Sequence, residues 1–312
     1  MIAATVSDGE IAAREHPDPR PGAGDVLVAV RAAGINNADL LQRLDRYPPQ
    51  LGPPPEIPGN EVAGEVVELG QACTRFAVGD RVMGLGYGCA QAQLAVVPER
   101  LLMPVPEGLD WAGAGGFPEA FTTAHEALFT ACGLGSGERL LVHGGAGGVG
   151  TAAVQLAVMA GARPTATVRS EALRDAVAAL GATALAPDGF AAHGPFDVVI
   201  EVIGASNLPQ DLESLAPGGR ICVLGLAGGA VADLDLRLVM HKEASVTGLA
   251  LRDRSLERRA TAARAVERCL LPALAAGQIQ VPLAATFPLA QVGRAYDHFA
   301  AGGKLGKVVL LI

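Results

Sequence analysis

The sequence has few of the residue patterns that bind metals or build disulfide frameworks. Its five cysteines stand singly, and no Cys-x-x-Cys pair occurs, so we expect reduced and mostly buried thiols. The six histidines are also dispersed, and none begins a His-Glu-x-x-His motif. A serine elbow of the form G-x-S-x-G is missing as well, which argues against a serine hydrolase. The sequence therefore predicts no metal site and no hydrolytic chemistry.

An excess of positive charge is also missing. The chain carries 24 basic and 32 acidic residues, a formal net charge of −8, so it has no broad positive field for phosphate backbones or anionic lipids. We expect neither nucleic acid nor a membrane as a partner. Residues 1–6 lead directly into Asp8-Gly9 without a basic and apolar leader, which predicts a cytoplasmic protein.

The length of the chain and the pattern of residue types along it predict two domains. The 312 residues, half of them apolar, suffice for two hydrophobic cores. Short β-branched runs broken by Pro and Gly fill the first third and predict an irregular β domain. From about Phe117, apolar strands alternate with Ala- and Leu-rich helical stretches, which predicts a doubly wound parallel sheet. The expected strands are 139–143, 164–168, 196–202, 220–224 and 245–251, and the expected helices are 151–160, 170–180 and 208–215. A charged helix at 255–275 and a final strand at 307–312 suggest that the C-terminus rejoins the first domain.

The sharpest local pattern is a glycine-rich turn between an expected strand and an expected helix. Gly145, Gly147 and Gly150 satisfy G-x-G-x-x-G. Without side chains the backbone can turn tightly and approach a diphosphate, and the amides at the helix N-terminus offer unpaired donors and a favourable dipole. We therefore predict a dinucleotide site here; the alternative is a turn that only packs the helix against the sheet. The residues of the turn are Gly144, Gly145, Ala146, Gly147, Gly148, Val149 and Gly150.

The end of the next expected strand indicates which dinucleotide binds. NAD-binding versions of the motif place a carboxylate about 20 residues on, where it binds the ribose 2′-hydroxyl. Here the strand ends in Arg169-Ser170, and Arg174 follows one helical turn later. Two guanidinium groups and a hydroxyl suit a 2′-phosphate, so NADPH is favoured over NADH. The alternative is that Ser170 only caps the helix and both arginines are solvated.

Several stretches resemble the medium-chain dehydrogenase/reductase superfamily. They are AGINNAD at residues 33–39, IPGNEVAG at 57–64 and VGDRV at 78–82. PVPEGL at 104–109, PEAFTTA at 118–124 and GKVVL at 306–310 are similar to its zeta-crystallin-like quinone oxidoreductase branch. Within that branch, residues 37–43 and 101–109 most resemble the animal quinone oxidoreductases that a tumour suppressor induces.

The resemblance implies a fold and the absence of zinc. The expected α/β architecture is a GroES-like catalytic domain, an irregular β-barrel of residues 1–117 and 252–312, around a Rossmann domain of residues 118–251. A homodimer joined at the edges of the Rossmann sheets is also implied. Zinc-dependent relatives place a cysteine where Asn36 stands, a histidine where Asn60 stands, and a four-cysteine lobe that is missing here. Because amides cannot replace thiolate and imidazole as a zinc ligand set, we expect no catalytic zinc and no simple alcohol oxidation.

Hydride transfer to a conjugated acceptor, such as a quinone or an enone, is the reaction that needs no metal. The resemblance implies that Asn36, Tyr47 and Thr123 line the nicotinamide and acceptor pocket, with Tyr47 either donating a proton or only forming a wall. An alternative is enoyl reduction of a specialised biosynthetic intermediate, and another is an NADPH-binding sensor or structural protein without turnover. The further cofactor contacts that the resemblance implies are Ile203, Gly204, Leu224, Gly225, Leu226, Leu249 and Lys307.

Overall fold

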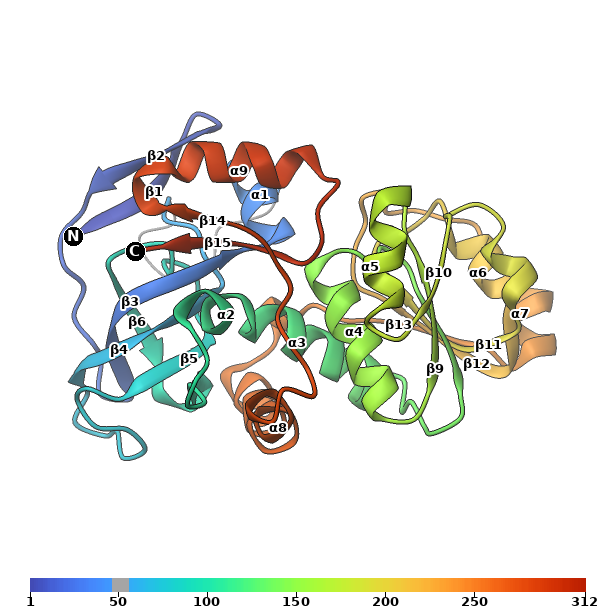
Figure 1. The fold of residues 1–312 in the computed structure, drawn as a ribbon, viewed down its shortest axis with the longest axis horizontal. Helices are drawn as coiled ribbons and strands as arrows, with labels where there is room; N and C mark the ends of the chain where they lie inside the picture. The colour runs from blue at the N-terminus through green and yellow to red at the C-terminus, as the bar shows by residue number, and fades with distance from the viewer. Residues whose placement is uncertain (47–55) are drawn as a thin grey trace. The chain divides into compact units, whose positions relative to one another are not determined.

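The chain folds into two compact units, which we describe separately. The computed structural model describes residues 1–46 and 56–312. The first unit comprises residues 1–122, 252–302 and 307–312, and the second comprises residues 123–251 and 303–306 (Figure 1). Relative to the expected domain limits, the first unit continues to Thr122, and a short C-terminal segment, Gly303–Gly306, belongs with the second unit.

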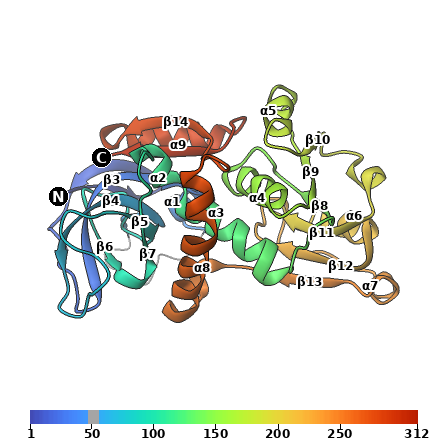
Figure 2. The ribbon, with the colours of Figure 1, turned by 60° about the horizontal axis from the view of Figure 1, so that its bottom comes forward.

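A six-stranded parallel sheet forms the centre of the second unit. Its order is β10-β9-β8-β11-β12-β13, and every neighbouring pair is parallel. The chain thus winds outward twice from the centre of the sheet, which is the Rossmann strand order and confirms the predicted doubly wound sheet. Figure 2 shows the strands in this order. The bounds are β8 (Arg139–Val142), β9 (Arg163–Thr167), β10 (Thr183–Leu185), β11 (Phe196–Glu201), β12 (Leu215–Val223) and β13 (Ser245–Gly248).

Helices cover both faces of this sheet. Helix α4 (Gly148–Met159) packs on β8 and β9, while α6 (Leu208–Glu213) and α7 (Leu236–Lys242) pack on β12 (Figure 2). An apolar core of side chains from β8, β11, β12 and α6 closes one face. The remaining helices are α3 (Pro118–His125), which crosses the unit boundary, the π-helix η2 (Glu126–Ala131), the 3-10 turns η3 (Glu171–Leu173) and η4 (Phe190–His193), and α5 (Arg174–Ala178).

Two predicted elements of the second unit differ in the structure. The helix expected at 170–180 is divided into η3 and α5, because Leu173 N–H bonds to the Ser170 carbonyl in a tight 3-10 turn. Strand β12 begins at Leu215, before Pro217-Gly218-Gly219, whereas the sequence predicts a helix up to residue 215 and a strand only from residue 220. The pairing of β12 with β11 shifts register between Phe196 and Val198, so the chain accommodates the proline and glycines as a bulge.

The first unit contains the expected irregular β structure. Its larger sheet has the order β14-β15-β3-β4-β5-β7, with β6 paired to β3, and β1 and β2 form a separate antiparallel pair. Strand β15 lies between β14 and β3, so the C-terminal strand rejoins this sheet as predicted (Figure 1). The strands are β1 (Ile2–Ser7), β2 (Glu10–Glu15), β3 (Asp25–Ile35), β4 (Glu61–Leu69), β5 (Arg81–Leu85), β6 (Leu94–Pro98), β7 (Leu102–Pro104), β14 (Leu283–Pro288) and β15 (Lys307–Leu311).

Short helices and one long helix pack on this sheet. The predicted charged helix is α8 (Leu256–Ala275), and Ser255 caps it by accepting a hydrogen bond from Arg258 N–H. No helix within residues 1–46 and 56–312 has the length and apolarity needed to cross a membrane. The other elements are α1 (Asn37–Arg43), α2 (Trp111–Gly116), α9 (Val292–Ala301), and the 3-10 turns η1 (Glu99–Leu101), η5 (Leu251–Asp253) and η6 (Leu289–Gln291).

Candidate functional site

The glycine-rich turn connects β8 to α4 at the carboxyl edge of the parallel sheet. Gly147 is the N-cap of α4, in an extended conformation, and the 12-residue helix begins at Gly148. The first amides of a helix have no partner within the helix, so those of residues 148–150 are available to an anion. Gly306 N–H donates to the Ala146 carbonyl at 2.7 Å, which ties the turn to the segment before β15.

Close packing explains why two turn positions are glycine. A Cβ atom on Gly145 would lie 2.6 Å from the Ala166 Cβ, and one on Gly150 would lie 2.3 Å from the Gly144 carbonyl oxygen. Both separations are far below van der Waals contact. By contrast, a Cβ on Gly147 would lie 3.4 Å from the same carbonyl oxygen, so packing does not require glycine there. Contact of this turn with a diphosphate stays a prediction.

The residues expected at the 2′-phosphate site lie together after β9. Arg169 is exposed, Ser170 is half-buried, and the half-buried Arg174 donates from Nε to the Val168 carbonyl at 3.3 Å. Glu171 Oε1 lies 3.9 Å from Arg174 Nη1, but its side chain is 91% exposed, so water screens this pair strongly. The segment is basic and open to a phosphate.

The other predicted cofactor contacts of the second unit follow β11, β12 and β13. Gly204 has a φ of +104°, and a Cβ on Gly225 would lie 2.2 Å from the Val202 carbonyl oxygen. Leu224 N–H donates to the Glu201 carbonyl, and Leu249 N–H to the Val223 carbonyl. Ile203 is half-buried and Leu226 is exposed. These segments end neighbouring strands at the edge of the sheet where α/β proteins bind ligands.

In the first unit, Asn36 belongs to a buried polar cluster with Glu61 and Lys307. Asn36 Nδ2 donates to Glu61 Oε1 at 2.8 Å, and Lys307 Nζ lies 2.6 Å from the same oxygen. Lys307 Nζ also donates to Asn36 Oδ1. Strands β15, β3 and β4 are neighbours, which brings these residues together. A Cβ on Gly34 would lie 2.0 Å from Glu61 Oε1, so that carboxylate needs a glycine on the adjacent strand.

Asp39, in the first turn of α1, extends the cluster. Its carboxylate accepts hydrogen bonds from Asn36 N–H at 2.8 Å and Gly59 N–H at 3.1 Å, and from Asn60 Nδ2 at 3.3 Å. Burial raises the pKa of Asp39 to about 7, and the charge of Glu61 adds to the increase. Near neutral pH this carboxyl is therefore partly protonated.

Glu119, at the start of α3, faces the same cluster. Its N–H donates to Glu61 Oε2 at 2.8 Å. Burial, with the negative charges of Glu61 and Asp39, raises the pKa of Glu119 to about 8. At pH 7 the Glu119 carboxyl is mostly neutral, so the Lys307 ammonium has the Glu61 carboxylate as its main counter-ion.

The amides of Asn36 and Asn60 do not fit a zinc ligand set. A catalytic zinc needs thiolate, imidazole or carboxylate ligands around an open position. Asn36 instead offers an amide whose oxygen and nitrogen already bond to Lys307 and Glu61. The ammonium group within hydrogen-bonding reach of Asn36 would repel a divalent cation. Asn60, where zinc-dependent relatives carry histidine, is likewise an amide bonded to Asp39.

The residues predicted to line the nicotinamide and acceptor pocket do not all belong to one unit. Asn36 lies in the cluster of the first unit, whereas Thr123 lies half-buried in α3, within the second unit. Tyr47 lies outside the described residues. Lys307, expected at a cofactor phosphate, has its ammonium against Glu61 and Asn36.

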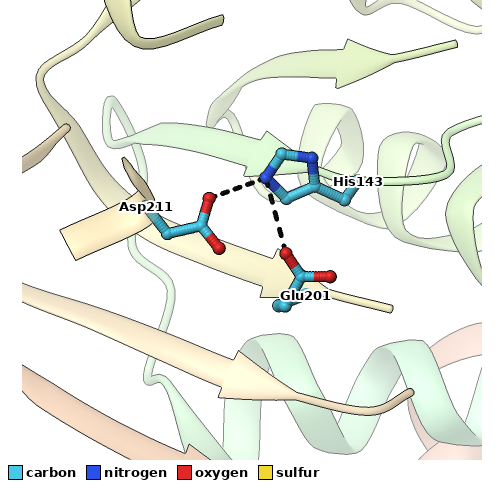
Figure 3. A group of neighbouring side chains, drawn as sticks. All are labelled: His143, Glu201 and Asp211. Carbon is cyan, nitrogen blue, oxygen red and sulfur yellow. Dashed lines mark hydrogen bonds and ion pairs between the residues drawn. The ribbon is translucent and has the colours of Figure 1, made fainter. Parts of the chain in front are cut away.

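Sequence reasoning missed the acidic members of the cluster. Asp39 and Glu61 lie in two of the motifs that carry the family resemblance, and Glu119 lies in a third. That position was the only available signal, because acidic residues are common on surfaces and nothing in their spacing predicts burial. A second buried acidic group, His143 with Glu201 and Asp211, was also not predicted (Figure 3).

Comparisons with known proteins agree with this architecture. The alcohol dehydrogenase GroES-like domain family matches residues 22–131, and the zinc-binding dehydrogenase family matches residues 148–268. The quinone oxidoreductase of Rattus norvegicus is 30% identical over 308 residues, covering 94% of this chain and 91% of the relative. The mycobacterial protein Rv1454c, solved in complex with NADPH, is 28% identical with a TM-score of 0.90 and full coverage of both chains.

Polyketide synthases are also relatives. A component of the phenolphthiocerol/phthiocerol polyketide synthase of Mycobacterium tuberculosis is 32% identical over 308 residues, which is 94% of this chain. This chain spans only 14% of that relative's length, and 9% of the Streptomyces orinoci spectinabilin synthase protein NorB. The similarity is thus to one segment of much longer proteins.

Together, the Rossmann-type sheet, its glycine-rich turn and the GroES-like β domain define the two-unit fold of the medium-chain dehydrogenase/reductase proteins. The chain belongs to the medium-chain dehydrogenase/reductase superfamily, in its quinone oxidoreductase-like branch.

Proposed function

We propose that this protein transfers hydride from NADPH to a quinone or another conjugated carbonyl compound, without a catalytic zinc. The observation that carries the proposal is the state of Asn36, whose amide is held between the Glu61 carboxylate and the Lys307 ammonium. An amide held in this way is not a ligand for a zinc ion that could activate an alcohol, so the site suits acceptors that are already electrophilic. The quinone oxidoreductase relatives and the NADPH complex of a structural neighbour support it.

In the second unit, the chain's own groups would hold the cofactor. Backbone amides at the start of α4 would bind the diphosphate, and the exposed guanidinium of Arg169 with Ser170 and Arg174 would bind the 2′-phosphate. When bound, NADPH supplies the hydride.

In the first unit, the second N–H of the Asn36 amide offers a hydrogen-bond donor on a fixed support, because Glu61 and Lys307 hold this side chain. A donor that is fixed before the reaction stabilises developing negative charge on an acceptor oxygen without reorganising. Glu119 and Asp39 keep protons near neutral pH, so the cluster contains acids that can resupply one. Thr123 and Tyr47 remain proposed contacts of the nicotinamide or the acceptor.

Enoyl reduction of a biosynthetic intermediate is a second candidate, favoured by the polyketide synthase relatives. The fold and cofactor would be the same, and only the acceptor differs.

A panel of acceptors separates these functions. We expect the absorbance of NADPH to fall on addition of quinones, with slower or no oxidation by enoyl thioesters. Oxidation by enones or enoyl thioesters alone would assign alkene reduction instead. Tight NADPH binding with no oxidation by any acceptor would identify a sensor or structural protein.

We also propose a homodimer joined through the β13 edge of the sheet. Among the described strands, β13 pairs only with β12, and its Val246 is 41% exposed. Two apolar side chains of α7, Leu236 and Met240, are 70% and 77% exposed. Large exposed apolar side chains and an unpaired strand edge are each typical of a protein interface.

The double variant Leu236→Glu/Met240→Glu should therefore be monomeric. Burying two carboxylates in an apolar interface costs several kcal/mol, so we expect dimer dissociation to increase by at least about 100-fold. Sedimentation or light scattering measures the change. Met159→Glu, at an exposed methionine of α4, is the matched control and should leave the mass unchanged. A wild-type monomer, or a dimer that survives the double substitution, would contradict the proposal.

A further inference from the structure

A buried group of three ionisable side chains lies below the predicted dinucleotide site. His143 follows β8, Glu201 ends β11, and Asp211 belongs to α6, and all three are almost fully inaccessible. Figure 3 shows both carboxylates turned toward one imidazole nitrogen. His143 Nε2 lies 2.8 Å from Asp211 Oδ1 and 3.7 Å from Glu201 Oε2. We call these three residues the acidic triad.

Among the residues that the structure describes, the acidic triad has no basic partner other than its own histidine. In residues 1–46 and 56–312, no lysine or arginine forms an ion pair with Glu201 or Asp211. The neighbouring elements contribute the Thr167 hydroxyl from β9, 3.0 Å from His143 Nδ1, and the Phe190 ring from η4, edge-on to the imidazole. Neither carries charge, so ionising both carboxylates would leave buried negative charge without compensation.

The buried negative charge is reduced if the carboxyls of Glu201 and Asp211 keep protons. Burial raises the pKa of Glu201 and of Asp211 to about 7, and it lowers the pKa of His143. Glu201 Oε2 and Asp211 Oδ2 have no hydrogen-bond donor among the described residues. A neutral His143 donating to Asp211, with one proton held by the two carboxyls, satisfies every group.

A metal ion fits the acidic triad less well than protons do. Ligands of a tetrahedral zinc about 2.0–2.1 Å from the metal are about 3.3 Å apart. The 2.8 Å between His143 Nε2 and Asp211 Oδ1 is shorter than this and is an ordinary hydrogen-bond length.

The acidic triad also connects two segments that are proposed to bind the cofactor. His143 directly precedes Gly144, the first residue of the glycine-rich turn. Glu201 Oε1 accepts hydrogen bonds from Ile203 N–H and, at 2.8 Å, from Gly204 N–H. Movement of Glu201 away from Asp211 would therefore displace the loop after β11.

We propose that His143, Glu201 and Asp211 are positioning residues that share protons, and that losing the last proton shared by the carboxyls loosens the dinucleotide-binding loops and weakens NADPH binding. The proposal rests on the proposed function, because it presumes that NADPH binds at this edge of the sheet.

The direction of the pH effect follows from the raised pKa values. Between about pH 4, where carboxyls of an unfolded chain ionise, and about pH 7, the carboxyls of Glu201 and Asp211 hold more protons in the folded protein than in the unfolded chain. Their contribution to the free energy of unfolding therefore falls as pH rises through this window, whereas the lowered pKa of His143 acts in the opposite direction. Above about pH 7, both carboxylates are charged and repel one another across the acidic triad.

The test compares NADPH affinity at about pH 6 and about pH 8.5 in wild type and in Asp211→Asn. The amide of Asn still accepts from His143 and donates to Glu201, so it imitates the protonated acid. We expect the wild-type Kd to rise about tenfold more over this range than the Kd of the variant. Because the comparison is relative, ionisation of the cofactor itself cancels. Glu201→Gln should behave like Asp211→Asn and replaces it if that variant is unstable.

Asp197→Asn is the matched control, because Asp197 lies at the other end of β11 and its carboxylate accepts a backbone hydrogen bond from Arg139 at 2.7 Å. It should keep the wild-type pH dependence. Equal pH profiles in wild type and Asp211→Asn would overturn this inference alone, as would a stoichiometric metal that is lost in Asp211→Asn. Failure of wild type to bind NADPH at any pH would overturn the proposed function as well.

Discussion

Replacing Gly147 with aspartate should abolish dinucleotide binding while leaving the protein folded. Gly147 caps α4 with φ −74° and ψ 171°, a conformation open to any residue. Aspartate is among the preferred N-cap residues, and its carboxylate would occupy the amides that a diphosphate needs. Like charges placed together cost several kcal/mol, so we expect the Kd for NADPH to rise by at least about 100-fold. Calorimetric titration measures the affinity, and thermal unfolding should show a melting temperature equal to or above that of wild type.

Gly147→Asn is the control for this prediction. Asparagine has the same size and caps a helix as well as aspartate does, but it brings no charge. We expect Gly147→Asn to bind NADPH clearly better than Gly147→Asp. Wild-type affinity in Gly147→Asp would show that the glycine-rich turn only packs α4 against the sheet.

Removing both arginines after β9 should reverse the cofactor preference. Each charge-assisted hydrogen bond to a 2′-phosphate contributes about 1.5–3 kcal/mol, and solvent at this open site reduces the gain. We therefore expect Arg169→Ala/Arg174→Ala to weaken NADPH binding by about tenfold for each arginine. NADH binding should remain within about twofold of wild type, because NADH has no phosphate there. Titration of both cofactors measures the ratio.

Arg163→Ala is the matched control, since Arg163 is an exposed arginine at the opposite end of the same strand, β9. It should change neither affinity. Equal loss of NADPH and NADH binding in the double variant would indicate a structural role, and no loss would mean that the arginines are solvated. Either result would contradict the assignment of NADPH.

Local sequence patterns predicted the secondary structure correctly where it depends on residues that are close in the chain. The strand before the glycine-rich turn and the helix after it are both present, because apolar runs and glycines act within one turn of the chain. The Pro217-Gly218-Gly219 segment misled the same reasoning. Its signal for a break is real, but pairing with β11 incorporates the break as a bulge inside β12, and pairing is a long-range interaction.

The residues of the candidate site also fall into those that a local motif predicts and those that only the packing of distant strands brings together. Gly147 and Gly150 could be found because one contiguous motif contains them. The cluster around Asn36 could not, because Glu61 and Lys307 are distant in sequence and meet only where β15, β3 and β4 lie side by side. The acidic triad likewise joins residues from β11, α6 and the end of β8.

By itself, the sequence determined the kind of protein: a doubly wound sheet with a glycine-rich turn, joined to a β domain that the C-terminus completes. These features arise from periodicity and turn chemistry, which act over a few residues. Only the tertiary structure decided which acids and bases are buried together, as in Glu61 with Lys307 and His143 with Asp211. Burial and the distance between charges set a group's pKa, and both depend on how distant strands pack.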